Sequence, residues 1–470
     1  MTDINKISSI YFAGIGGIGM SALARSFNMR GVKVSGYDKT ETALTKKLMQ
    51  EGIQIHYEDD VNLLDKNADV VVYTPAIPSS HKELNYFKEN NYTLLKRSDV
   101  LGLLTNDTFN ICVAGTHGKT TTSAMIAHIL KHSGFGCNAY LGGIAANYDT
   151  NYLASSHKVS VVEADEYDRS FLKLQPDVAI ITAMDADHLD IYGTAENMED
   201  AFIEFSTKIK SNGCLIIKHG LKRGDDFKIN DTCTYSLNDK DANIHVENLQ
   251  IKNGAYEFDV VNNYWTLKDV VLNMGGLHNI ENVIAAIGVA KYLKIDDEKI
   301  KLAVASFSGV KRRFEYIIKS PELVMIDDYA HHPEELRALI TGAKELFSQK
   351  KCTVIFQPHL FSRTKDLADG FAEVLSLADE IILMPIYPAR ELPIEGVTSE
   401  LILNKMKSSN VKILNKDELL EYLRVLKVAP SEGFRDALII TAGAGDINFN
   451  TLANFYFFAV HSRYEQGNAS

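Results

Sequence analysis

The sequence has few cysteines, and those it has show no paired spacing. Five are scattered along the 470 residues: Cys112, Cys137, Cys214, Cys233 and Cys352. A zinc ribbon or a disulfide framework would need close pairs, so neither is indicated. We therefore expect a protein of a reducing compartment, and the cytoplasm fits best.

Long apolar runs are absent as well. No stretch reaches the roughly eighteen apolar residues that cross a bilayer. The opening residues, MTDINKISS, have no charged region followed by an apolar segment, as an export signal would. We expect neither export nor membrane insertion.

Positive charge is in the minority. Lys and Arg number 49 against 61 Asp and Glu, which gives a formal net charge of -12. Broad nucleic-acid binding draws on clustered Lys and Arg, so we expect no nucleic-acid partner. A local basic pocket for phosphates remains compatible with this balance, and composition leaves a monomer and a dimer equally open.

What the sequence does contain is an alternation of short apolar runs and amphipathic stretches. This alternation is typical of parallel sheets covered by helices. The chain is 46% hydrophobic and 23% charged, and its 470 residues exceed what one core usually supports. We predict an α/β fold of three domains, at residues 1–106, 107–320 and 321–470.

A glycine-rich turn follows the first apolar run. Gly14, Gly16 and Gly19 form G-x-G-x-x-G between a predicted strand at residues 8–13 and a predicted helix at 20–30. Asp38 lies near the acidic position of a dinucleotide fingerprint. Such glycines allow a tight turn and a close backbone approach to a phosphate. Any diphosphate joined to a ribose would satisfy them, so NAD is only one candidate.

A second glycine turn carries a lysine and a threonine. In GTHGKT, Gly118, Lys119 and Thr120 stand between a predicted strand that begins at Asn110 and a long helix. Backbone N–H groups and the helix dipole favour a polyphosphate there, and the two side chains supply charge and a ligand for Mg²⁺. The general P-loop motif has glycine where this chain has Val113, so the turn is shorter. A plain turn with a surface lysine is the alternative interpretation.

Acidic residues follow the next predicted strand. Glu163 ends this strand, in VSVVEAD, at the sheet edge where the phosphate turn is expected, which makes it the candidate carboxylate ligand of Mg²⁺. His188, in DADHLD, is compatible with a second metal position, but a single histidine is more often a structural hydrogen-bonding group. Asp165, Glu166 and Asp168 are equally compatible with a solvated acidic loop.

The order of these motifs resembles the ATP-dependent Mur ligases of peptidoglycan synthesis. The resemblance is carried by GIGGIGMS, GTHGKTTT, EADEYDRSFLKLQP, MDADHLDIYG, HNIENVIAA, FSGVKRRFE, DDYAHHPEEL, FQPHLFSRT, PAREL, PIEGVTS and GAGD. It implies a Rossmann-like domain for a UDP-sugar at residues 1–106 and a P-loop ATPase-like domain for ATP at 107–320. A C-terminal Rossmann-like ligase domain would follow at 321–470.

The resemblance also implies an activity. ATP, with Mg²⁺ as the metal cofactor, would activate the carboxylate of UDP-N-acetylmuramate as an acyl phosphate, from which L-alanine would displace the phosphate. The nearest alternative is a sister ligase that joins UDP-N-acetylmuramate to a recycled murein tripeptide. An NAD-dependent dehydrogenase would leave GTHGKTTT, Glu163 and Arg313 without a role. A non-catalytic nucleotide sensor would have no need of the metal ligands.

Site residues follow from the same resemblance. Chemistry is assigned to Lys119, Glu163, His188, Arg313 and His332. ATP contacts are assigned to Gly115, Thr116, His117, Gly118, Lys119, Thr120, Thr121, Asn282, Arg313 and Asp328. The metal ligands are Thr120, Glu163 and His188. Contacts to the other substrates are assigned to Gly14, Gly16, Gly17, Gly19, Met20, Ser21, Asp38, Thr74, His331, His359 and Arg363.

Some of these residues have plainer interpretations. Asn279 and Asn282 look like capping residues at a helix start. Arg312, beside Arg313, is compatible with a surface charge pair. Either His332 or a bound water is a candidate acceptor for the proton of the amine.

The chain departs from the family pattern in three places. Leu360 stands in FQPHLFSRT where many relatives carry arginine, so one substrate contact is either absent or supplied by another residue. No lysine is assigned as the carbamylated metal bridge of some sister ligases. The final stretch, INFNTLANFYFFAVHSRYEQGNAS, is less helical and less family-like than expected, and its aromatic run is compatible with a core, an interface or a tail.

Overall fold

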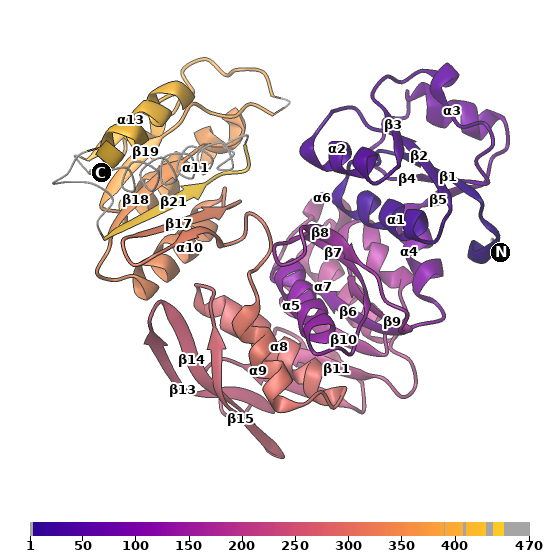
Figure 1. Ribbon diagram of the computed structural model, residues 1–470, viewed down its shortest axis with the longest axis horizontal. Coiled ribbons are helices and arrows are strands. Elements are labelled where there is room, and N and C mark those ends of the chain that lie inside the picture. Colours follow the sequence, from indigo (N-terminus) through magenta and orange to yellow (C-terminus); the bar gives the residue numbers. More distant parts are fainter. Residues whose placement is uncertain (1–2, 390, 408–409, 429–435, 446–470) are drawn as a thin grey trace, which may run out of the picture. The chain divides into compact units, whose positions relative to one another are not determined.

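The chain is an α/β protein in the part that the structure describes. The structure is a computed structural model that describes residues 3–389, 391–407, 410–428 and 436–445, and within these ranges it contains three sheets (Figure 1). The fold class expected from the sequence is confirmed. The aromatic C-terminal stretch discussed above lies outside the described residues.

The chain divides into two compact units. The first unit comprises Met1–Leu249, Glu257–Leu272 and His278–Phe307. The second comprises Gln250–Tyr256, Asn273–Leu277 and Ser308–Ser470. In the described ranges, no helix combines the length and apolar character needed to cross a membrane.

The first sheet has five parallel strands in the order β3-β2-β1-β4-β5. The strands are β1 (Ser9–Ala13), β2 (Lys33–Tyr37), β3 (Gln54–His56), β4 (Val70–Tyr73) and β5 (Leu94–Lys96). The helices are η1 (Ile4–Lys6), α1 (Ile18–Met29), α2 (Ala43–Gln50), η2 (Val61–Leu63), α3 (Lys82–Glu89) and α4 (Arg97–Thr105). Strand β1 is buried throughout, as a central parallel strand should be. The order reverses at β1, so a crevice is expected beyond the ends of β1 and β4.

The second sheet has ten strands in the order β15-β14-β13-β12-β11-β10-β6-β9-β7-β8. The strands are β6 (Phe109–Ala114), β7 (Asn138–Ala145), β8 (Thr150–Leu153), β9 (Val159–Glu163), β10 (Val178–Ile181), β11 (Cys214–Lys218), β12 (Thr232–Ser236), β13 (Ile244–Lys252), β14 (Ala255–Asn262) and β15 (Trp265–Leu272). The helices are α5 (Lys119–His132), η3 (Tyr167–Lys173), α6 (Leu189–Tyr192), α7 (Ala195–Ser206), η4 (Gly224–Asp226), α8 (Leu277–Tyr292) and α9 (Asp297–Ser306). Strand β6 runs parallel to β9 and β10 on its two sides, so the ends of these three strands meet at one edge.

The third sheet has six strands in the order β16-β17-β21-β18-β19-β20. The strands are β16 (Glu315–Lys319), β17 (Leu323–Asp328), β18 (Lys351–Phe356), β19 (Glu380–Leu383), β20 (Val411–Ile413) and β21 (Ala437–Ala442). The helices are α10 (Pro333–Leu346), α11 (Phe361–Leu375), α12 (Glu400–Leu403) and α13 (Lys416–Val428). Among these six strands, β16 is antiparallel to β17, and the other neighbouring pairs are parallel.

Buried hydrogen bonds fasten helix α1 to the hairpin of β7 and β8, all within the first unit. Arg25 is 3% exposed and donates to the side chain of Asn151 and, at 2.8 and 2.9 Å, to Glu51. Asn151 is fully buried and donates to the Ser21 hydroxyl at 2.9 Å and to the carbonyl of Ile18 at 2.6 Å. The first two sheets are therefore joined by buried polar contacts as well as by the chain.

Candidate active site

The first glycine turn connects β1 to α1, and its three glycines are needed for different reasons. Gly14 has φ = 85°, in the region that favours glycine. A Cβ on Gly16 would come within 2.7 Å of the Asp38 carboxylate, and a Cβ on Gly19 would lie 2.4 Å from the Arg97 guanidinium. The turn therefore lets the backbone at the start of α1 approach a phosphate closely.

The other residues assigned to this turn differ in how they are placed. Asp38 accepts the backbone N–H of Gly16 at 2.7 Å, so its carboxylate braces the turn. Thr74 follows β4 directly, and the turn that it starts packs against the first glycine. Met20 and Ser21 have buried side chains. The Ser21 hydroxyl is bonded to Asn151 and to the carbonyl of Ile18, and the Ser21 N–H is bonded to the carbonyl of Gly17.

The second glycine turn connects β6 to α5 and presents the start of a helix. Gly115 has φ = 133° and Gly118 has φ = 83°, which again favours glycine. Helix α5 begins at Lys119, so its first N–H groups and its dipole face the turn. The Lys119 ammonium donates to the carbonyl of Gly115 at 2.5 Å and to the Glu166 carboxylate at 2.8 Å. The lysine is thus folded back over its own turn.

Asn282 and Thr182 hold this turn from two sides. Thr182 donates its hydroxyl to the carbonyl of His117. Asn282 accepts the hydroxyl of Thr122 at 3.1 Å, and a Cβ on Gly118 would come within 2.6 Å of its amide oxygen. Asn282 lies inside α8 rather than at its start, so the interpretation of this residue as a helix cap is wrong.

The remaining residues of the turn are placed at its edge. The Thr116 hydroxyl accepts the N–H of Asp185 at 3.1 Å, which brings the residues after β10 to the turn. His117 is exposed, and its Nε2 lies 3.8 Å from the Asp185 carboxylate. Thr121 is buried within α5.

Glu163 ends β9 beside the turn and meets Thr120. The Thr120 hydroxyl donates to one carboxylate oxygen at 3.0 Å, and the N–H of Gly142 in β7 donates to the other at 3.0 Å. Burial raises the pKa of Glu163, and the nearby Lys119 ammonium and both hydrogen bonds oppose that shift. A hydroxyl and a carboxylate oxygen side by side are hard ligands of the kind that Mg²⁺ prefers.

Gly142 is a residue that sequence reasoning missed. A Cβ at this position would lie 2.3 Å from both carboxylate oxygens of Glu163, so only glycine leaves room for that carboxylate. The available signal was the Gly-Gly pair in LGGIA, because glycine inside a strand often marks a close approach by a neighbouring group.

His188 stands directly before α6 and faces two carboxylates. Its backbone is left-handed, with φ = 49° and ψ = 40°. Its Nε2 lies 3.8 Å from Glu166 Oε1 and 3.7 Å from Asp187 Oδ2. The rings of His188 and Tyr167 pack in a T-shaped arrangement, with their centroids 5.3 Å apart. The histidine expected to bind metal is thus held beside a carboxylate that the family motif did not assign.

The acidic loop after β9 is not a solvated loop. Glu166 is fully buried and lies 2.8 Å from the ammonium of Lys119. Asp165 accepts the guanidinium of Arg97 at 2.8 Å, and Asp168 accepts the ammonium of Lys96 at 3.1 Å. The loop is therefore fixed to the start of α4 by two ion pairs.

A cavity of about 100 Å³ lies between α1 and the end of β9. Gly19 lines it from α1 and Arg97 from the start of α4, and Gly142, Glu163 and Asp165 line it from β7, from β9 and from the loop after β9. The cavity connects the first glycine turn with the carboxylate beside the second.

In the second unit, Asp328 closes a turn at the end of β17. Its carboxylate accepts the N–H of Phe314 at 2.6 Å and of Ala330 at 2.7 Å. Burial raises the pKa of Asp328 to about 6, although these hydrogen bonds and the charge of Arg313 lower it. Arg313 itself is exposed on this turn.

Arg312 is a structural clamp rather than a surface charge. Its guanidinium donates to the carbonyls of Gly443 and, at 3.2 Å, of Gly445. It also lies 3.4 Å from the Asp327 carboxylate and 5.0 Å from the ring centre of Tyr329. Arg312 therefore ties the end of β17 to the end of β21, and the surface-pair interpretation is wrong.

Three of the residues assigned to substrates lie together after β17 and β18. The rings of His331 and His359 are 6.2 Å apart, and Arg363 Nη1 lies 3.3 Å from His359 Nδ1. His359 stacks on Tyr387 at 5.8 Å. Burial lowers the pKa of His359, and the charges of Arg363 and His331 lower it further. His332 is exposed at the start of α10.

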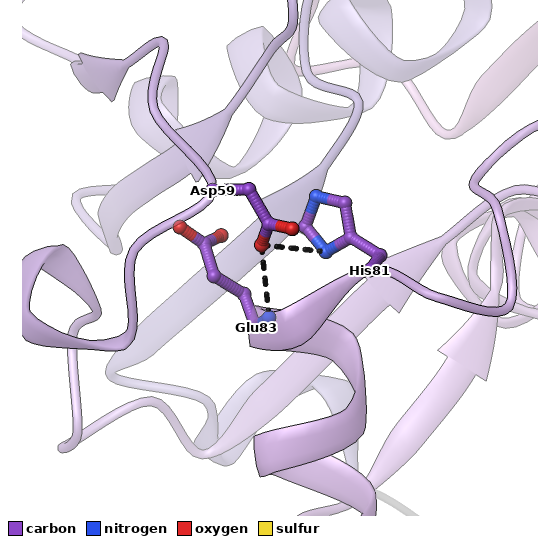
Figure 2. Close-up of side chains that lie close together, drawn as sticks. All are labelled: Asp59, His81 and Glu83. Atoms are coloured by element: carbon purple, nitrogen blue, oxygen red, sulfur yellow. Dashed lines mark hydrogen bonds and ion pairs between the residues drawn. The ribbon is translucent and has the colours of Figure 1, made fainter.

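Another group of potential metal ligands lies at the start of α3. Ligand atoms of Asp59, His81 and Glu83 lie within 4.8 Å of one another (Figure 2). The Asp59 carboxylate already accepts the N–H of Lys82 at 2.9 Å and of Glu83 at 3.0 Å, and the Glu83 carboxylate lies 2.7 Å from the Nε2 of His56. We interpret this group as the cap of α3, which sequence reasoning did not find.

The two glycine turns occur in a chain that matches three family models over most of its length. Residues 9–108 match the catalytic domain of the Mur ligase family, and residues 113–290 match the Mur ligase middle domain. Residues 312–445 match the model described as Mur ligase, glutamate ligase domain. The chain belongs to the Mur ligase family, as the resemblance implied.

Individual relatives are similar over nearly the whole chain. The UDP-N-acetylmuramate–L-alanine ligase of Flavobacterium johnsoniae is 49% identical over 450 residues, which are 95% of this chain and 96% of that protein. The protein of the same name from Phocaeicola vulgatus is 47% identical, with 95% and 97% covered. The solved UDP-N-acetylmuramate-alanine ligase of Thermotoga maritima gives a TM-score of 0.80 at 29% identity and covers 98% of this chain and 99% of its own.

Proposed function

We propose that this protein joins L-alanine to the carboxylate of UDP-N-acetylmuramate and converts ATP to ADP and phosphate. The observation that carries the proposal is the meeting of Lys119, Thr120 and Glu163 at the start of α5. The relatives named above support the choice of substrates. A reaction that consumes ATP, in a chain whose cysteines are unpaired, fits the cytoplasm.

We assign the two nucleotides to the two glycine turns. The ATP polyphosphate suits the second turn, where a helix start is combined with a lysine. The UDP diphosphate suits the first turn. The cavity between Gly19 and Glu163 supports this arrangement, because the muramate part of the UDP-sugar must reach from one turn toward the other.

Mg²⁺ is the metal that the residues of the second turn fit. The Thr120 hydroxyl and the Glu163 carboxylate lie 3.0 Å apart, and both would hold the ion through oxygen. When bound, the ion neutralises charge on the phosphate oxygens of ATP.

The reaction has two covalent steps. A carboxylate oxygen of the muramate attacks the γ-phosphorus, the bond to the ADP oxygen breaks, and an acyl phosphate forms. Lys119 neutralises charge on the transferring phosphoryl oxygens, and we assign Arg313 to the same phosphoryl group. The neutral amine of L-alanine then attacks the acyl carbon, phosphate departs, and the nitrogen loses a proton. His332 and a bound water remain the two candidates for the proton acceptor.

The test is to identify the amine that the protein accepts. With UDP-N-acetylmuramate, ATP and Mg²⁺, we expect L-alanine to give UDP-N-acetylmuramoyl-L-alanine by mass spectrometry, with one ADP for each product molecule. The murein tripeptide in place of L-alanine should give little product. A higher kcat/KM with the tripeptide would contradict the proposal in favour of the sister ligase.

A further inference from the structure

A fully buried glutamate lies at the start of α3, and no step of the proposed reaction uses it. The side chain of Glu83 has no exposed surface. Its Oε1 accepts the N–H of Asp60 at 3.1 Å and lies 2.7 Å from Nε2 of His56, and its Oε2 accepts the hydroxyl of Tyr11. A buried carboxylate is costly unless it is hydrogen-bonded. The partners of this one come from β1 and from the segment that ends β3.

The loop after β3 and the start of α3 hold each other from both sides. The Asp59 carboxylate accepts the N–H of Lys82 at 2.9 Å and of Glu83 at 3.0 Å (Figure 2), while the Glu83 carboxylate accepts bonds from the loop in return. Strand β3 has three residues and lies at the edge of its sheet, so its pairing with β2 alone would hold its end weakly. The position of His56, which ends β3, therefore depends on Glu83.

The end of β3 is connected to the first glycine turn by hydrogen bonds. The carbonyl of His56 accepts the N–H of Asp38 at 3.1 Å, and the carboxylate of Asp38 accepts the N–H of Gly16 at 2.7 Å. The next residue, Tyr57, donates its hydroxyl to Thr45 at 3.0 Å. A Cβ on Gly16 would lie 2.7 Å from the Thr45 methyl group, so Thr45 also packs against the turn. The end of β3 thus contacts both side chains that enclose Gly16.

We propose that Glu83 and His56 are positioning residues for the UDP-sugar. They hold Asp38 where it braces Gly16, and thereby keep the first glycine turn in the shape that accepts a diphosphate. The inference rests on the proposed function, which assigns the UDP diphosphate to this turn. Both residues act through Asp38 rather than on the substrate, and the turn assigned to ATP follows a strand of another sheet. The competing role for the pair is to stabilise the fold and nothing more.

His56→Leu separates these roles, because it removes the ring bond to Glu83 and keeps the backbone carbonyl. Calorimetric titration of the full-length chain measures the binding of UDP-N-acetylmuramate and of a non-hydrolysable ATP analogue. We expect the UDP-sugar to bind about tenfold more weakly, the effect of losing about one hydrogen bond, and the analogue to bind as in wild type. In turnover assays, KM for the UDP-sugar should rise while kcat stays unchanged. His56→Gln, whose amide nitrogen replaces Nε2, should restore most of the affinity.

Asp65→Asn is the matched control for stability. The Asp65 carboxylate accepts the hydroxyl of Ser9 at 2.9 Å and lies 2.9 Å from the ammonium of Lys33, where β1 and β2 begin. These contacts lie at the opposite end of the two strands from the glycine turn. The control should lower the melting temperature and leave the binding of both ligands unchanged.

The outcomes separate the inference from the proposed function. Unchanged binding of the UDP-sugar by His56→Leu would overturn the inference, and so would equal weakening of both ligands or equal weakening in Asp65→Asn or His56→Gln. Failure of the wild-type chain to bind UDP-N-acetylmuramate would instead overturn the proposed function. Should His56→Leu fail to fold, His56→Asn, whose shorter amide does not reach Glu83, is measured in the same way and should show the same loss.

Discussion

Lys119 is the residue on which the proposed nucleotide chemistry depends most. Its side chain is 14% exposed and is held by a buried carboxylate and by its own turn. A charge in such a place is poorly screened by water, so it interacts with a phosphate more strongly than a surface lysine would. The proposed role of Lys119 as a phosphate ligand is consistent with this placement.

Replacing this lysine should stop phosphoryl transfer and leave binding of the UDP-sugar intact. We expect Lys119→Ala to lower kcat for ADP release at least about a hundredfold, as removal of one charge-stabilising donor does elsewhere. Calorimetric titration with UDP-N-acetylmuramate should be unchanged. Lys131→Ala, an exposed lysine in the last turn of the same helix, is the control. Substantial turnover by Lys119→Ala would show that the ATP site lies elsewhere.

We expect substitution of Gly142 to be as damaging as substitution of Glu163, the proposed metal ligand that it faces. The added methyl group of Gly142→Ala would lie 2.3 Å from the Glu163 oxygens, so the carboxylate must turn away from Thr120. We expect Mg²⁺-dependent kcat to fall about ten- to a hundredfold, with the melting temperature as the check on folding. Gly224→Ala, where nothing lies within 4 Å of the new Cβ, should behave as wild type. Equal activities in the two variants would contradict the account of Glu163.

The sequence predicts the site residues that stand in local motifs, but it does not predict the contacts between distant segments. Lys119 and Thr120 stand in one short motif, and Glu163 ends an apolar run, so each has a local signal. The contact between Lys119 and Glu166 spans 47 residues, and that between Arg312 and Gly443 spans 131. Such contacts depend on strand pairing between distant segments, which no local pattern encodes.

At the scale of elements, each glycine turn follows a strand with parallel neighbours on both sides. The alternation of apolar runs predicts that the strands exist and that helices separate them. It does not predict that β6 lies between β9 and β10, or that β21 enters between β17 and β18. Strand order is set by packing across the whole sheet, so the strands that flank each glycine turn are known only from the structure.

The carboxylate of Glu380 links three strands of the third sheet to one another and to helix α13. Glu380 begins β19. Its carboxylate accepts hydrogen bonds from the ammonium of Lys351 in β18 at 2.9 Å, from the ammonium of Lys412 in β20 at 2.5 Å and from the hydroxyl of Tyr422 in α13 at 2.5 Å. Burial alone would raise the pKa of Glu380, but these partners lower it to about 2. The ionised form is therefore the one that holds these elements together.

The stabilisation from Glu380 should depend on pH. Because the folded pKa lies below the ordinary value, the contribution is complete near neutral pH and is lost as the pH falls toward 2. We expect Glu380→Gln to lower the free energy of unfolding by about 1–3 kcal/mol at pH 7. Urea unfolding should show a smaller difference from wild type at pH 3.5. An equal difference at both pH values would contradict this account, and the exposed Glu345→Gln should show none.

At the scale of the whole molecule, membership in the Mur ligase family accounts for the three sheets in their order along the chain. The first unit contains both glycine turns and the cavity between them. The second unit contains Arg313, Asp328 and the histidine cluster. Each unit therefore has its own set of assigned residues, and the proposed reaction uses both sets.

The junction of the first two sheets should matter for stability. Asn151→Ala removes partners from the buried Arg25 guanidinium and from the Ser21 hydroxyl. We expect a loss of about 1–3 kcal/mol in the free energy of unfolding, because these polar groups would remain buried. Urea unfolding measures it, with the exposed Asn67→Ala as the control. No loss relative to the control would show that the junction is held by apolar packing alone.

The activation of the muramate carboxylate by ATP is tested most directly by following the carboxylate oxygens. UDP-N-acetylmuramate labelled with ¹⁸O in both carboxylate oxygens is turned over with ATP and L-alanine, and the released phosphate is analysed by mass spectrometry. We expect one ¹⁸O atom in each phosphate, because the oxygen that attacks the γ-phosphorus leaves with it, while the other stays in the amide. Product formed together with phosphate that carries no ¹⁸O would contradict the mechanism.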